Sequence, residues 1–112
     1  MTQTTLLSAI LDSLKDPILF ADTEHITRYM NKAAVAHYRE GEGLIGRSLL
    51  ECHNEHSQKR IQEILTAMKV SGLEEELIAD DDRRRVYMRA VRDNRGEVLG
   101  YYERYEWKEG ER

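Results

Sequence analysis

The chain has 112 residues, 40% of them hydrophobic and 34% charged, a length that suits one compact domain with its own core. Its 17 basic and 21 acidic side chains give a net charge of −4, which disfavours nucleic acid as a partner because phosphate binding needs a basic face. With one cysteine, no long apolar stretch and no signal-peptide pattern at its start, we expect a bacterial, cytoplasmic protein without disulfides or a membrane partner.

An amphipathic helix is predicted over residues 4–15. Leu7, Ile10 and Leu14 recur at helical spacing, and Pro17 takes the chain out of helix. We therefore divide the chain into an N-terminal helical segment, 1–16, and a domain over 17–112. An isolated helix this short is marginal in water, so its apolar stripe must pack on something. We expect it to form a homodimer contact, and the alternative is that it folds back on its own sheet.

The rest of the chain contains alternating and apolar runs separated by turn residues, which are typical of short strands. Five strands are predicted, at residues 17–21, 26–30, 73–79, 85–92 and 98–107. Between the second and third strands, a short helix is predicted at 32–38 after the N-cap residue Asn31, and a longer helix at 56–70 before Gly72. This order of elements predicts an α+β fold.

Three segments carry a family resemblance. DPILFADTEHITRYMNKAA resembles the opening hairpin of PAS domains, GLIGRSLLECH the entry to their helical flap, and YMRAVRDNRGEVLGYYERYEW their closing hairpin. The resemblance covers about residues 6–107. It implies a PAS fold, in which a helical flap covers one face of a five-stranded antiparallel sheet, and a sensory module that is not an enzyme.

A narrower resemblance concerns the segment GRSLLECHNEHSQKRIQEIL. It is similar to PAS domains of bacterial hemerythrin-linked proteins, and to the haem PAS domain of carbon-monoxide-responsive regulators, where a histidine followed four residues later by serine carries the iron. His53 and Ser57 have this spacing. The resemblance implies haem as a candidate cofactor, with His53 as the metal ligand and His56 as the substitute.

On a continuous helix, positions 53, 57, 61, 64 and 68 share one face, which would direct His53 into an apolar pocket suited to haem iron. The alternative is that His53 only begins the helix or hydrogen-bonds within a filled core. The predicted pocket residues are His53, His56, Ile61, Ile64, Leu65 and Met68.

Other chemistry has weaker support. Residues 41–46 match the letters of the dinucleotide pattern G-x-G-x-x-G, but no strand precedes them and no parallel crossover follows, so the glycines are interpreted as loop residues. Cys52, His53 and His56 are fewer ligands than a structural zinc site needs. No paired carboxylates or nucleophile–base pair indicates an enzyme.

We therefore predict a sensory module that binds a small ligand, with haem as a candidate, beneath the flap. It would signal through homodimer contacts or a signalling protein partner. The alternative is a PAS module without a pocket or cofactor that acts only in dimerisation or docking. Tyr101, Tyr105 and Trp107 share one face of the last strand, which would line the core, the pocket or a dimer contact.

Overall fold

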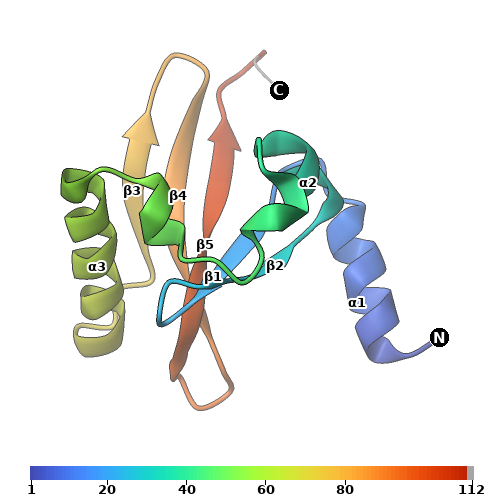
Figure 1. Ribbon diagram of the computed structural model, residues 1–112, viewed down its shortest axis with the longest axis horizontal. Coiled ribbons are helices and arrows are strands. Elements are labelled where there is room, and N and C mark those ends of the chain that lie inside the picture. Colours follow the sequence, from blue (N-terminus) through green and yellow to red (C-terminus); the bar gives the residue numbers. More distant parts are fainter. Residues whose placement is uncertain (111–112) are drawn as a thin grey trace.

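The structure is a computed structural model, and it describes residues 1–110. The helices and strands follow one another in the predicted order (Figure 1). The elements are α1 (Gln3–Asp12), β1 (Leu19–Asp22), β2 (Thr27–Met30), α2 (Lys32–His37), the short 3-10 helices η1 (Gly41–Leu44) and η2 (Leu49–Cys52), α3 (Glu55–Val70), β3 (Glu75–Asp80), β4 (Arg84–Arg92) and β5 (Val98–Trp107).

The five strands form one antiparallel sheet in the order β2-β1-β5-β4-β3, which confirms the predicted α+β fold. At the centre of the sheet, the first strand β1 pairs with the last strand β5, and Ala21 lies opposite Tyr101. The central position of β5 places it against both the N-terminal hairpin and the long β4 strand. A side chain on its inner face therefore lies close to α3 as well as to the neighbouring strands.

Two strands, β1 and β3, begin two residues later than predicted, each for a local reason. The backbone N–H of Ile18 donates to the Asn31 side chain (2.9 Å), so β1 starts at Leu19. After α3, Gly72 has a positive φ of 74° and Leu73 N–H donates to the Ala67 carbonyl (3.3 Å). Residues 71–73 thus complete the helix end, and β3 starts at Glu75.

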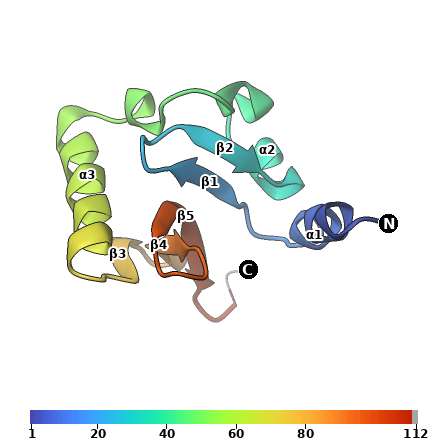
Figure 2. The same cartoon turned by 90° about the horizontal axis from the view of Figure 1, so that it is seen from below.

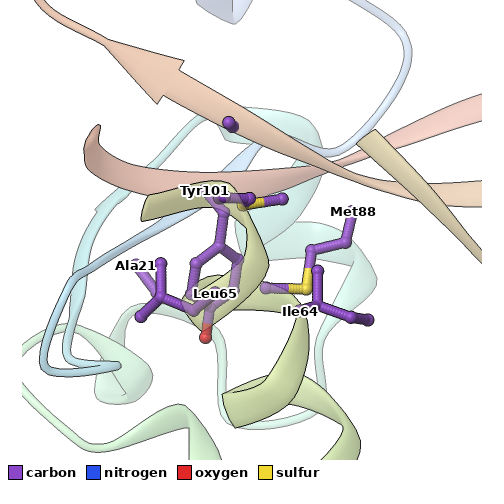
Figure 3. Packing of buried hydrophobic residues seen from close by; sticks show 7 residues of the cluster. Ala21, Ile64, Leu65, Met88 and Tyr101 are labelled. Atoms are coloured by element: carbon purple, nitrogen blue, oxygen red, sulfur yellow. The ribbon is translucent and has the colours of Figure 1, made fainter. Parts of the chain in front are cut away.

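One face of the sheet is covered by α3 and the segment before it, while α1 lies at the opposite end of the molecule (Figure 2). Side chains from α3, β1, β4 and β5 interlock in the main core (Figure 3). This cluster consists of Ala21, Ile64, Leu65, Met68, Met88, Ala90 and Tyr101. A second cluster, under α2 and η1, contains Leu19, Met30, Ala34 and Leu44.

The fully buried Asn31 joins these layers. Its Oδ1 accepts hydrogen bonds from the N–H groups of Ile18 and Ala34 (both 2.9 Å), and its Nδ2 donates to the carbonyls of Leu11 (2.9 Å) and Asp16 (3.2 Å). Every polar atom of this side chain is therefore paired. The residue predicted as an N-cap also anchors the end of α1 to the sheet.

The N-terminal helix is shorter than the predicted 4–15, because it ends at Asp12 with Ser13 as its C-cap. The Ser13 hydroxyl donates to the Ile10 carbonyl (2.6 Å) and the Asp12 carboxylate accepts from Lys32 N–H (2.9 Å), which ties the helix end to α2. No residue of α1 is buried. Its apolar stripe is therefore left largely uncovered within this chain.

Candidate functional site

A cavity of about 210 Å³ lies between α3 and the inner face of the sheet, and we call it the α3 cavity. Its wall combines apolar side chains from four elements with a few polar groups. The lining residues are Leu49, His53, His56, Ser57, Arg60, Ile61, Ile64, Ile78, Met88, Tyr101 and Glu103. A larger hollow of about 550 Å³ adjoins it along α3, but charged, exposed side chains such as Lys59 and Glu63 line much of that surface.

Four of the six predicted pocket residues line the α3 cavity: His53, His56, Ile61 and Ile64. Leu65 and Met68 do not. They are buried in the core beneath, at 3% and 0% exposure. Helical periodicity therefore placed Ile61 and Ile64 on the side of α3 that faces the cavity. Leu65 and Met68 pack directly against the sheet, where no cavity is left.

His53 lies in the wall of the cavity, but it does not continue the helix, as the shared-face argument assumed. Asn54 is the N-cap of α3, and its side chain accepts a hydrogen bond from Ser57 N–H (2.8 Å). His53 therefore precedes the helix, with extended backbone angles (φ −121°, ψ 151°). Gln58 holds this connection by donating to the carbonyls of Leu50 (2.7 Å) and His53 (2.9 Å).

The mouth of the cavity is more polar than its interior. His56 is exposed there, and the Arg60 guanidinium reaches across to donate to the Leu77 carbonyl on β3 (2.6 Å). This hydrogen bond connects the helix to the edge strand of the sheet. Arg60 therefore forms part of the rim of the site.

Glu103, on the inner face of β5, is a site residue that the sequence interpretation missed. The Tyr105 hydroxyl donates to its Oε2 at 3.4 Å. Burial raises the pKa of the Glu103 carboxyl, and this effect outweighs the opposing influence of the nearby His53, Tyr105 and Arg84. Strand alternation contained the signal, since Glu103 lies between Tyr101 and Tyr105, which were already placed on one face.

Tyr101 closes the inner end of the cavity. Its hydroxyl forms a 2.8 Å hydrogen bond with Nδ1 of the buried His25. Burial raises the pKa of Tyr101 well above its usual range, and burial together with Lys69 lowers the pKa of His25. Both side chains are therefore held in their neutral forms near pH 7.

Within residues 1–110, no group of three or more histidine, cysteine, aspartate or glutamate side chains is placed to hold a metal ion. Cys52 is a free, exposed thiol. Among the same residues, none of the helices has both the length and the apolar character needed to cross a membrane.

The α3 cavity matches haem in its donor atoms but not in its size. A histidine in an apolar wall is a usual ligand for haem iron, and His53 provides one. Pockets for drug-sized molecules span roughly 300–1,000 Å³, and haem is at least as large as such molecules. A cavity of about 210 Å³ therefore fits a smaller ligand.

Comparison with solved structures shows the fold. The C-terminal domain of a Streptococcus mutans protein superposes with a TM-score of 0.77 at 18% identity, covering 95% of this chain and 85% of that one. A PAS domain from Colwellia psychrerythraea gives a TM-score of 0.66 at 15% identity, with 96% and 98% covered. The Aer2 receptor of Vibrio cholerae, described as a dual PAS-heme oxygen sensor, gives 0.54 at 18% identity, with 81% and 92% covered.

Comparison with the curated proteins gives no match. A family model described as a PAS domain matches residues 7–106, which is most of the chain. PAS domains are in general sensory or interaction modules and not enzymes. The sheet order, the helical layer over one face and this match agree, and the chain belongs to the PAS domain family.

Proposed function

We propose that this chain is a sensory module that binds a small, mostly apolar ligand in the α3 cavity. The observation that carries the proposal is the cavity itself, which is apolar except for a few convergent polar groups, as small-molecule sites usually are. A pocketless module would fill this space with side chains.

The position of the cavity supports a route for the signal. Its lining comes from the segment 49–64 on one side and from β3, β4 and β5 on the other. A ligand that prefers one spacing of these layers would shift the population of conformers towards that spacing. Because β5 pairs with β1, which follows α1, such a change would reach the N-terminal helix and a partner bound there.

Haem is the second candidate ligand, supported by His53 in the wall and by the description of the Aer2 neighbour. If the flap opened to admit it, His53 would be the iron ligand and His56 the substitute. The small volume favours a smaller ligand, so we expect no 1:1 uptake of hemin. A Soret band that His53→Ala removes and His37→Ala retains would instead establish haem.

Native mass spectrometry of the purified protein tests the main proposal. We expect a mass increment from a small molecule in the wild type. Ile61→Trp should remove it by filling the cavity, and Ile45→Trp, at an exposed position outside it, should not. If the increment is absent, and neither small probe molecules nor hemin bind, the protein is a docking module. The uncovered stripe of α1 favours that alternative.

A further inference from the structure

Glu103 is the one acidic side chain among the residues that line the α3 cavity. The other lining groups that carry or gain a charge are Arg60, His53 and His56. Arg60 and His56 are exposed at the mouth, whereas Glu103 is partly buried on the sheet. The interior of the cavity thus has an acidic side chain, and basic side chains lie at its rim.

The Glu103 carboxylate is poorly paired. In the part of the chain that the structure describes, its one hydrogen bond is the long 3.4 Å contact from Tyr105, and no cation lies within ion-pair distance of it. Two carboxylate oxygens accept about four hydrogen bonds. Arg60 is directed away, towards the Leu77 carbonyl. Most of the accepting capacity of Glu103 is therefore left for a molecule in the cavity.

A partly buried carboxylate with so few partners is costly, and an ammonium group relieves this cost in two ways. It supplies a counter-charge where water is largely excluded, and it donates charge-assisted hydrogen bonds, which are roughly twice as strong as neutral ones. A hydroxyl supplies only the hydrogen bond. A carboxylate ligand would add repulsion. The cavity should therefore distinguish molecules of equal size by their charge.

We propose that the α3 cavity is selective for small primary amines, with the ammonium group bound by Glu103 and a short apolar body against Ile61, Ile64 and Met88. This inference rests on the proposed ligand-binding function and specifies its ligand class. The volume of about 210 Å³ limits the body to a few carbon atoms. Burial raises the carboxyl pKa in the free protein, so binding of the cation should lower it again.

The test is a ¹H–¹⁵N NMR titration at pH 7 with n-butylamine, 1-butanol and butyrate, which share similar apolar bodies and differ in charge. We expect resonances of cavity residues to shift with the amine at a Kd at least tenfold lower than with the alcohol, and not to shift with butyrate. Glu103→Gln keeps the size of the side chain and should abolish this preference. Glu106→Gln, at an exposed position on the same strand, should leave it unchanged.

The comparison of the three probes in the wild type does not depend on whether the Glu103→Gln variant folds. A second measurement follows the pKa of the Glu103 carboxyl by ¹³C NMR. This pKa should fall when n-butylamine is added. Equal or tighter binding of 1-butanol or butyrate in the cavity would overturn the amine inference and leave the ligand-binding proposal intact. If none of the three probes shifts the cavity resonances and the carboxyl pKa is unchanged, the amine inference is wrong, while the native mass spectrum still decides the ligand-binding proposal.

Discussion

At the scale of single residues, Gly100 shows how closely β1 and β5 approach each other. It pairs with Asp22, and a Cβ at this position would collide with the Ala21 carbonyl oxygen and lie 2.6 Å from the Phe20 ring. Gly100→Ala should therefore destabilise the protein by about 1–3 kcal/mol, as overpacking usually does. Gly96→Ala is the control without a clash. Gly96 also has a positive φ (85°), but a Cβ there would meet no atom within 4 Å. Urea unfolding that finds Gly100→Ala no more destabilising than this control would contradict the close approach.

Single residues also show which parts of the candidate site could be predicted from the sequence. Ile61 and Ile64 followed from helical periodicity, because a repeating pattern reports which face of a helix is buried. His53 was expected on that face, but Asn54 is the better N-cap and starts the helix after it. Glu103 was missed because a charged residue in a strand is normally assigned to solvent. Its environment depends on α3, which is distant in the sequence.

At the scale of elements, α1 has apolar side chains that its own chain does not cover. Leu6, Leu7 and Ile10 are about half exposed, at 47%, 51% and 49%. Beside the helix, an apolar hollow of about 530 Å³ continues over the outer face of the sheet. It is lined by Leu11, Leu14, Ile18, Phe20, Tyr29, Val91 and Tyr102. Together these surfaces support the proposal that a second copy of the chain covers α1.

Ile10→Asp places a charge on the uncovered stripe of α1 and should convert a dimer to a monomer, because desolvating an unpaired carboxylate is costly. Light scattering at several concentrations measures this. Ser8→Asp, two residues and about 160° of helix rotation from Ile10 on an exposed side of α1, should leave the dimer intact. A monomeric wild type would reject the homodimer. A dimer that survives Ile10→Asp would place the interface elsewhere, with the Tyr105–Trp107 end of β5 as the next surface to test.

At the scale of the whole molecule, His25 connects three regions. Its side chain hydrogen-bonds Tyr101 on β5, and its carbonyl accepts from Leu49 N–H at the start of η2 (2.7 Å). Its positive φ of 66° holds the turn between β1 and β2 in a left-handed conformation. The turn, the central strand and the flap therefore meet at one buried residue, His25.

The buried imidazole predicts a pH dependence of stability. Burial lowers the pKa of His25 in the folded protein, Lys69 adds to this, and Asp22 opposes it. As pH falls, the unfolded chain then takes up the proton first, near the ordinary pKa of about 6.5. The stability that the neutral His25 contributes is fully present above about pH 6.5. This contribution declines as the pH falls from there towards the pKa of His25 in the folded protein.

Thermal unfolding between pH 5 and 8 checks this expectation. His25→Asn should lower Tm at pH 7.5 by removing the hydrogen bond with Tyr101, while asparagine tolerates the positive φ. The decline of Tm between pH 7 and 5 should become shallower in this variant. His56→Asn, at an exposed histidine, is the control and should keep the wild-type slope. A His25→Asn slope equal to that of the wild type would show that His25 is not the titrating group.

The sequence by itself determined the order of helices and strands, because periodicity, turn residues and N-caps act over a few neighbouring positions. Its resemblance to PAS segments indicated the five-stranded sheet and the family. Tertiary structure alone decided the rest. The size of the α3 cavity, the burial of Glu103 and the position of Leu65 and Met68 beneath the cavity arise where η2, α3, β3, β4 and β5 meet. Their side chains are separated by many residues in the chain, so no local pattern reports how much space is left between them.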